Sequence, residues 1–407
     1  MNRHWRSHHH RNAILLSLAA VIFLVNTQWI TPAASIQPPT PTDDGRACIS
    51  CHKSIVQTHL HTAHYLSSAP ADASSIRGSF NEGRNRFVYN DHMEVVMEKK
   101  NGVYLQTGLF NGNLYESEAF DIVIGWRKGQ TYLYWDNNRL LQLPISWYAP
   151  ADAWCNSPGY PTNLIYFNKQ VPGQCMECHA SAANLNTDDN GVVTYDRNSL
   201  LLGIGCQRCH GDGTQHIAWH TAHPADSLAG RYIMNARHLS RQQRLDACAL
   251  CHSGFRKPLR PNFSFRVGDT LDHFSTPNYD TAATATLDVH GNQYGLLTSS
   301  KCFIRSANLD CSSCHNVHID ETGQMATYSQ RCMTCHNGHD QPGCASPAIR
   351  QMKVVNNCVD CHMPALPSNK IILQVNGSST PVHDLVRSHR VAIYPEISEA
   401  WLKAHRQ

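Results

Sequence analysis

The chain has 407 residues, and its 17 cysteines and 26 histidines far exceed the usage of ordinary globular domains. Charged residues make up only 16% of the chain, and 42% of the residues are apolar. The formal net charge of +3 comes from Arg3, Arg6 and Arg11, because without them basic and acidic residues are equal in number. A chain without a basic excess is not typical of nucleic-acid binding, so we expect no nucleic-acid partner.

Residues 1–35 have the layout of a secretory signal peptide. The three arginines precede an apolar run from Ala13 to Val25, and small residues around Ala34 offer a cleavage site, although Pro32 makes it imperfect. The run is short for a membrane span, which needs about 20 residues. We therefore predict export to the periplasm or another extracytoplasmic location. The alternative is an uncleaved leader that associates with the membrane, and residues 36–46 follow as a proline-rich linker.

Residues 84–150 lack cysteine and show the alternating apolar pattern of β-strands. Asn101-Gly102 and Asn111-Gly112 favour two-residue hairpin turns, in which both central residues need a positive φ. We predict a small antiparallel β meander over 84–150. Its expected strands include 103–105, 120–126, 131–135 and 140–147.

The rest of the chain contains the motif C-x-x-C-H seven times, and every C-x-x-C pair is followed by histidine. Two thiols three positions apart can both reach the vinyl groups of one haem, and the next histidine then lies under the iron as proximal ligand. The motifs therefore predict seven covalently bound haem c groups. In chain order, motifs 1 to 7 are Cys48/Cys51/His52, Cys175/Cys178/His179, Cys206/Cys209/His210, Cys248/Cys251/His252, Cys311/Cys314/His315, Cys332/Cys335/His336 and Cys358/Cys361/His362.

Zinc sites, redox-active dithiols and disulfide frameworks also use paired cysteines. A zinc site does not require histidine at the same position after every pair, and neither does a thioredoxin-like motif. A disulfide framework would not repeat one spacing seven times. Haem attachment takes place outside the cytoplasm, in agreement with the predicted leader, so we interpret all seven motifs as haem sites.

Three cysteines lie outside the motifs: Cys155, Cys302 and Cys344. An odd number of thiols cannot all pair within one chain. We expect one disulfide, most plausibly Cys302 with Cys344, and a buried free Cys155. A thiolate haem ligand is the alternative.

The motifs also divide the chain. Residues 47–83 hold motif 1 and form a first haem segment, and residues 151–407 hold the other six motifs and form a six-haem cytochrome region. From Cys155 onward the chain shows little apolar periodicity long enough for a self-sufficient helix bundle, so haems should replace much of the core. The predicted fold class is mainly α, with much irregular structure packed around stacked haems and the β meander inserted after the first haem segment.

Outside the leader and the motifs, 15 histidines are available as second axial ligands, which exceeds the seven that are needed. A single surplus histidine is as often a surface or propionate-binding residue as a ligand. Ligation of iron by two histidines gives a low-spin centre without an open position. That arrangement favours electron transfer over substrate chemistry.

Several segments between the motifs resemble multihaem c-type cytochromes of the cytochrome c-552/c-554 type, relatives of the tetrahaem electron acceptor of hydroxylamine oxidoreductase. The resemblance spans roughly residues 47 to 395. The segments are Thr62-Ala-His64 after motif 1, Ile124-Gly-Trp126 with Tyr132-Leu133, Leu143-Pro144 with Trp147, Ser157-Pro-Gly-Tyr160, Cys206 to Gly213 with His216, Val289-His290-Gly-Asn-Gln293, Cys314-His-Asn-Val-His318, Cys361-His-Met-Pro364 and Arg387-Ser-His389-Arg390.

The resemblance implies that distal iron ligands are found among these segments. Which haem each ligand serves stays open, because in such proteins the ligand often comes from the segment of another haem. The implied ligands are His64, His216, His290, His318 and His389, and our weaker choices for the remaining two are His223 and His339.

We therefore expect an electron-transfer protein that exchanges electrons with redox partner proteins or a membrane quinol-oxidising complex. The alternative is a multihaem oxidoreductase acting on a small nitrogen or sulfur compound at one haem with an open position. The sequence contains no C-x-x-C-K motif, and histidines exceed the number of ligands needed, so no haem is marked as open. We predict no catalytic residue.

Overall fold

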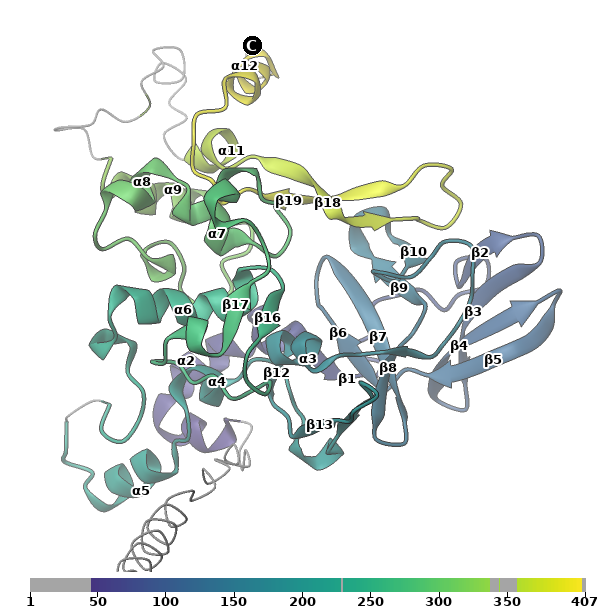
Figure 1. Cartoon of the computed structure of the whole chain (residues 1–407), viewed down its shortest axis with the longest axis horizontal. Coiled ribbons are helices and arrows are strands. Elements are labelled where there is room, and N and C mark those ends of the chain that lie inside the picture. The colour runs from purple at the N-terminus through teal and green to yellow at the C-terminus, as the bar shows by residue number, and fades with distance from the viewer. Residues whose placement is uncertain (1–44, 228–229, 337–343, 345–356, 405–407) are drawn as a thin grey trace, which may run out of the picture. The chain divides into compact units, whose positions relative to one another are not determined.

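The computed structural model describes residues 45–227, 230–336, 344 and 357–404 (Figure 1). The predicted leader, nearly all of the predicted linker and the candidate ligand His339 lie outside these residues. Within the described ranges, each helix is too short or too polar to cross a lipid bilayer.

Helix and strand occur in similar amounts, at 31% and 27% of the residues. The prediction of a mainly α fold is therefore wrong. Several strands outside the predicted meander have only two or three residues and pair as two-stranded sheets, such as β12 (Ala180–Ala182) with β15 (Leu201–Leu202). Runs this short show no alternation of apolar residues, so the sequence pattern could not reveal them.

The largest sheet has seven antiparallel strands. Its order is β1-β6-β7-β8-β11, while β9 pairs with β7 and β10 pairs with β9. The sheet takes its first strand from the segment of motif 1 and its last from the segment just before motif 2. The bounds are β1 (Ser68–Pro70), β6 (Ile122–Ile124), β7 (Gly129–Asp136), β8 (Arg139–Gln142), β9 (Ile145–Tyr148), β10 (Ala153–Asn156) and β11 (Lys169–Gln170).

A second sheet has four antiparallel strands in the order β2-β3-β4-β5. Its two predicted hairpin turns are confirmed: Asn101 and Gly102 connect β3 to β4 with φ of 51° and 84°, and Asn111 and Gly112 connect β4 to β5 with φ of 50° and 74°. Asparagine and glycine tolerate this left-handed backbone better than other residues. The bounds are β2 (Arg86–Asn90), β3 (Met93–Lys100), β4 (Val103–Phe110) and β5 (Asn113–Ala119).

Side chains from both sheets share one apolar core. Met97 of β3 packs there with Tyr132 of β7 and Trp154 of β10, and all three are almost completely buried. The Tyr132 hydroxyl donates to Gln130 Oε1 at 3.0 Å, so the ring is buried without an unpaired polar atom. Side chains of the two sheets and of the segments that connect their strands line this core.

Short helices carry or surround the motifs, and the longest that bears one, α6, has 12 residues. Among the described residues, the α-helices are α2 (Ile49–His59), α3 (Gly173–His179), α4 (Cys206–His210), α5 (Thr214–Ala222), α6 (Arg241–His252), α7 (Gln293–Thr298), α8 (Lys301–Arg305), α9 (Met325–Met333), α11 (Cys358–His362) and α12 (Pro395–Ala404). The 3-10 helices are η1 (Arg46–Cys48), η2 (Tyr65–Ser67), η3 (Ala149–Ala151), η4 (Arg197–Ser199), η5 (Ala236–His238), η6 (Leu271–His273), η7 (Thr281–Thr286) and η8 (Cys311–Ser313).

Three further hairpins lie between or after the motifs. Two are short, and the third is the long C-terminal hairpin coloured yellow in Figure 1. This long hairpin contacts the larger sheet, because Asp384 accepts hydrogen bonds from the Tyr148 hydroxyl at 3.0 Å and from Lys128 Nζ at 2.8 Å. The pairs are β13 (Leu185–Thr187) with β14 (Val193–Tyr195), β16 (Arg256–Pro258) with β17 (Ser275–Pro277), and β18 (Ala365–Leu373) with β19 (Val382–Arg387).

Candidate haem-binding site

Most of the motifs begin in a helical turn, which places their two cysteines on one side. Motifs 3 and 7 coincide with the short helices α4 and α11, while motifs 2 and 4 end the helices α3 and α6. Residues three positions apart lie on the same face of a helix, so both thiols can face one porphyrin. The local helical turn therefore places the two cysteines of a motif where both can attach to one haem.

Side chains just ahead of the motifs cap these helices. Ser240 and Gln243 form a reciprocal capping box at the start of α6. Asn357 accepts a hydrogen bond from the Asp360 backbone at the start of α11. Such caps satisfy backbone N–H groups that the first turn leaves free, which matters most for helices of one or two turns.

Four of the motif histidines lie opposite a second histidine from a distant segment. Each second histidine belongs to the predicted distal set: His64, His216, His318 and His389. The distances between ring centres are 6.3 Å for His52 and His216, 6.2 Å for His210 and His318, 6.1 Å for His252 and His64, and 6.1 Å for His315 and His389.

This spacing fits an iron between two imidazoles. Metal–nitrogen bonds of about 2 Å place two axial nitrogens about 4 Å apart, and the ring centres then lie about 6 Å apart. Direct face-to-face stacking would bring parallel rings closer, yet the rings of His52 and His216 are only 18° from parallel at 6.3 Å. Four independent pairs within 0.2 Å of one another therefore fit haem better than ordinary ring packing.

Backbone carbonyls fix the tautomer of several of these rings. His210 Nδ1 donates to the Met234 carbonyl at 2.9 Å, and His216 Nδ1 donates to the Arg231 carbonyl at 2.8 Å. A carbonyl can only accept, so Nδ1 carries the proton and the Nε2 lone pair is left for a metal. Histidine ligands in metalloproteins usually have such a partner. In motif 7, His362 Nδ1 donates to the Ala392 carbonyl at 2.8 Å.

Burial keeps the paired imidazoles neutral. It lowers the pKa of His64 to about 4, with the neighbouring His252 as the next cause. Burial likewise lowers the pKa of His389 to about 4, followed by the effect of His315. Neutral imidazole is the form that ligates iron, so both rings are ready to bind at physiological pH.

The cysteines of different motifs also lie close together. Hydrogen bonds join Cys178 of motif 2 to Cys251 of motif 4, Cys248 of motif 4 to Cys311 of motif 5, and Cys332 of motif 6 to Cys358 of motif 7. These sulfur atoms would each be a thioether in the loaded protein. Their proximity therefore brings the edges of neighbouring haems together.

Cys51 of motif 1 lies differently from most of the motif cysteines. Cys51 is exposed, as are Cys209 and Cys335, whereas the other motif cysteines are partly buried. Helix α2, which carries Cys51, buries only Val56 among its 11 residues, so most of this helix faces away from the protein interior. The Cys51 Sγ accepts a hydrogen bond from the neighbouring Ser50 hydroxyl at 3.8 Å. The thioether of Cys51 to haem stays a prediction.

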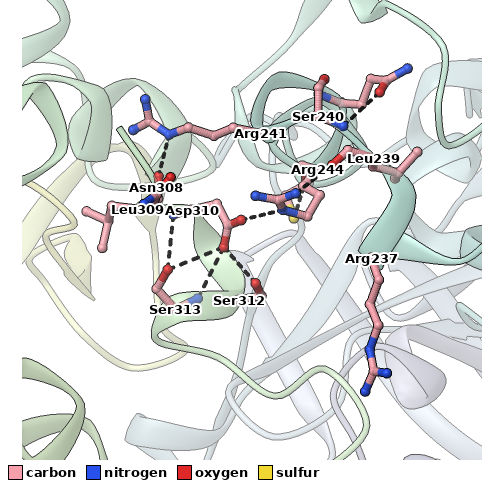
Figure 2. Close-up of polar contacts among 12 residues, drawn as sticks. Arg237, Leu239, Ser240, Arg241, Arg244, Asn308, Leu309, Asp310, Ser312 and Ser313 are labelled. Carbon is pink, nitrogen blue, oxygen red and sulfur yellow. Dashed lines mark hydrogen bonds and ion pairs between the residues drawn. The ribbon is translucent and has the colours of Figure 1, made fainter. Parts of the chain in front are cut away.

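An ion pair joins motifs 4 and 5. Arg244, one turn before Cys248, donates to Asp310, which directly precedes Cys311, at 2.6 Å. Figure 2 shows the Asp310 carboxylate between Arg244 and the hydroxyl of Ser312, with Ser313 on the same side. This contact fixes the spacing of two motifs without using a haem.

Similar pairs lie beside motifs 6 and 7. Arg331, which directly precedes Cys332, donates to Glu321 at 2.8 Å and to the Cys314 carbonyl at 2.6 Å. Arg387 of β19 pairs with Asp360, inside motif 7, at 2.8 Å. Arginine and carboxylate thus recur at the boundaries of the motifs.

An open surface hollow of about 580 Å³ lies beside motif 3 and is lined by His210, Tyr232, Met234 and His238, among others. Cofactor pockets typically have volumes of about 300–1,000 Å³. The space next to the proximal histidine therefore suits a porphyrin.

The remaining predicted ligands are placed differently. His223 stacks on Trp219 with ring centres 3.9 Å apart, and His290 lies near Asp384 and Asp288. His339 lies outside the described residues. Among the described residues, no second imidazole lies at about 6 Å from the motif histidines His179, His336 and His362.

Three other histidines are not among the distal ligands predicted from the sequence. His59 lies 6.3 Å from His318, but its Nε2 donates to the Ile204 carbonyl at 2.9 Å and is not free for iron. His383 Nδ1 donates to the Ser368 carbonyl at 2.8 Å, the arrangement of a ligand. His220 lies one turn after His216, and its buried Nε2 has no hydrogen-bond partner among the described residues. Only the helical spacing of His216 and His220 could have been noticed in the sequence.

All three cysteines outside the motifs are free thiols. The predicted disulfide between Cys302 and Cys344 is therefore wrong. Cys302 instead interacts with Cys335, and Cys344 interacts with Cys361. Cys155 is free and buried as expected, with an exposed fraction of 1%.

Comparisons with known proteins agree with the motifs. A family model described as cytochrome c554 and c-prime matches residues 165–211, which contain motifs 2 and 3. The chain is 25% identical over 208 residues to the C-type polyheme cytochrome OmcC of Geobacter sulfurreducens, and this match covers 51% of the chain and 22% of OmcC. No solved structure matches. The matches and the motifs together support a multihaem c-type cytochrome with covalently bound haem c, for which electron transfer is the function that homology suggests.

Proposed function

We propose that this protein is an exported heptahaem c-type cytochrome that transfers electrons through a chain of bis-histidine haems. The observation that carries the proposal is the pairing of four motif histidines with a second imidazole at 6.1 to 6.3 Å. Two imidazoles on one iron leave no position for a substrate. Electron transfer is therefore favoured over catalysis at these four motifs.

Bound haem would supply one-electron transfer between Fe(II) and Fe(III) states. The role of the chain is to hold the motifs close together and to keep their axial ligands in place. Buried imidazoles with a fixed tautomer perform the second task, because a rigid ligand set need not rearrange when the charge on iron changes.

The contacts between motifs support a continuous path. Cysteine contacts link motifs 2, 4 and 5, and separately link motifs 6 and 7. Imidazole pairs link motif 1 to the segment after motif 3, and motif 3 to the segment after motif 5. Arg331 joins motif 5 to motif 6. Every motif thus has at least one contact with the segment of another.

The electron donor in this proposal is a redox partner protein or a membrane quinol-oxidising complex, and the acceptor is a second redox protein. Export through the predicted N-terminal leader would place the chain in the periplasm or another extracytoplasmic space, where haem c is attached. The same leader, if uncleaved, would hold it at the membrane.

The test is to purify the exported holoprotein and to count haem per chain from the pyridine haemochrome spectrum. We expect seven haems with low-spin iron in the oxidised state. Electron paramagnetic resonance and exposure to cyanide or nitrite provide the second readout. A strong high-spin signal with rapid ligand binding would overturn the proposal and favour an oxidoreductase that acts on a small nitrogen or sulfur compound.

A further inference from the structure

The residues between the paired cysteines differ among the motifs, and those of motifs 2 and 3 contact each other. Glu177 lies between Cys175 and Cys178, and Arg208 lies between Cys206 and Cys209. Arg208 Nη2 donates to the Glu177 backbone carbonyl at 3.2 Å and lies 3.9 Å from Glu177 Oε1. One ion pair therefore connects the interiors of two haem-binding motifs.

Both charges are buried and held by fixed partners. The exposed fractions of the two side chains are 7% for Arg208 and 14% for Glu177. The Glu177 carboxylate accepts hydrogen bonds from Asn262 Nδ2 at 2.8 Å and from the Phe263 backbone N–H at 2.7 Å. The Arg208 guanidinium lies over the Phe263 ring, 5.4 Å from its centre. Water screens such charges poorly, so they act over longer distances than surface charges.

Arg208 lies where three motifs meet. Its charge interacts with the sulfur atoms of Cys209 in its own motif, of Cys178 in motif 2 and of Cys251 in motif 4. The last two sulfur atoms also contact each other. A single buried cation therefore faces the attachment points of three haems.

In two other ion pairs beside the motifs, the arginine is more exposed than either partner of the Glu177–Arg208 pair. The exposed fractions are 29% and 5% for Arg244 and Asp310, and 26% and 7% for Arg331 and Glu321. Of these three pairs, only Glu177–Arg208 has both partners inside C-x-x-C-H motifs. The field of this pair at the haems should be the least screened of the three.

We propose that the Glu177–Arg208 pair sets the reduction potentials of the haems bound by motifs 2, 3 and 4. Oxidation adds one positive charge to a haem, which a nearby cation disfavours and a nearby anion favours. Arg208 therefore raises these potentials and Glu177 lowers them. This inference rests on the proposed electron-transfer function, since it concerns where electrons reside along the path.

A purely structural pair would behave differently. If the contact only holds two segments together, loss of either partner loosens the same packing, and both losses shift the potentials in the same direction or not at all. If the charges set the potentials, the two losses shift them in opposite directions. The sign of the shift therefore separates the two roles.

The experiment uses the full-length holoprotein with Arg208→Gln, Glu177→Gln and both together, after a haem count on each. In a spectroelectrochemical titration, Arg208→Gln should shift a subset of the haem potentials downward, Glu177→Gln should shift them upward, and the double variant should reverse most of either shift. Arg208→Lys keeps the charge and should stay near the wild type. Arg84→Gln is the matched control, because Arg84 and Asp152 form an ion pair whose side chains are 54% and 73% exposed.

Shifts of the same sign in both single variants, or no shift in either, would overturn the inference. If Arg208→Gln does not load haem, the test depends on Glu177→Gln alone. An upward shift of the haem potentials in Glu177→Gln then supports the inference, and any other result overturns it. Failure of the proposed function can be distinguished from failure of this inference. Open, ligand-binding iron in the wild type would overturn that function whatever the signs of these shifts, whereas same-sign shifts in a fully low-spin protein would overturn only the role of the pair.

Discussion

The Asp310 carboxylate accepts a hydrogen bond from Arg244 Nε at 2.6 Å and thereby joins the helix of motif 4 to the turn that begins motif 5. Asp310 is also the N-cap of that turn and accepts a hydrogen bond from the Ser313 backbone. Burial alone would raise its pKa, but hydrogen bonds from Ser312 and Arg244 outweigh burial and lower the pKa. The ionised carboxylate is therefore the form that stabilises the fold.

Asp310→Asn should lower the free energy of unfolding by about 1–2 kcal/mol, because it removes the charge of a buried ion pair while keeping a side chain that can cap the turn. Denaturant unfolding of haem-loaded protein measures this loss. Arg84→Gln breaks an exposed pair and should change stability by at most about 1 kcal/mol. Equal losses in the two variants would contradict the role assigned to Asp310.

The effect of Asp310 should also depend on pH. A carboxyl with a lowered folded-state pKa contributes stability that is complete above its unfolded pKa of about 3.9 and is lost as pH falls through the folded pKa. The stability difference between wild type and Asp310→Asn should therefore be largest near neutral pH and shrink below about pH 4. A difference that persists unchanged in acid would show that the carboxylate charge is not responsible.

Cys155 should resist alkylation in the folded protein. Burial raises the pKa of its thiol to about 12, and its Sγ donates to the Ser146 carbonyl at 3.5 Å. Thiolate is the reactive form, so iodoacetamide should label Cys155 only after unfolding. Peptide mass spectrometry of folded and denatured samples checks this. Cys155→Ala should keep the full haem content, whereas a loss of haem would support the thiolate-ligand alternative.

The sequence predicted best those features that depend on interactions between residues close together in the chain. The C-x-x-C-H motifs and the turns at Asn101-Gly102 and Asn111-Gly112 depend on residues within a few positions of each other. The predicted fold class was wrong because short strand pairs such as β12 with β15 leave no periodic pattern, and because the two sheets form an apolar core mainly from their own side chains. The Glu177–Arg208 contact also joins residues that no local rule connects.

Changing Cys178 to Ser should weaken or remove one haem attachment and leave the other six. One thioether would remain possible at Cys175, so the haem of motif 2 becomes labile rather than absent. Intact-protein mass spectrometry under denaturing conditions measures the number of haems that stay attached. Cys302→Ser is the control, since this thiol lies outside the motifs and its loss should leave all haems attached. Zinc or unmodified thiols at the motif cysteines would contradict the haem interpretation altogether.

The last prediction concerns His318, three residues after the proximal His315. Its ring lies 6.2 Å from that of His210, so the iron it would ligate belongs to motif 3. From the sequence we expected His318 to ligate the haem of motif 6 or motif 7, but its ring lies opposite His210 of motif 3. The sequence could not identify motif 3, because that contact joins segments far apart in the chain.

His318→Met should keep every haem attached, because both thioethers of motif 3 are untouched, and should raise one reduction potential, since thioether ligation favours reduced iron. A potentiometric titration measures the shift. His92→Met is a suitable control, because His92 lies in the β-rich part and its Nδ1 contacts Asn111 Oδ1 at 2.7 Å. If His318→Met leaves all potentials and the low-spin spectrum unchanged, His318 is not a ligand, and the distal ligand assignments would have to be redrawn.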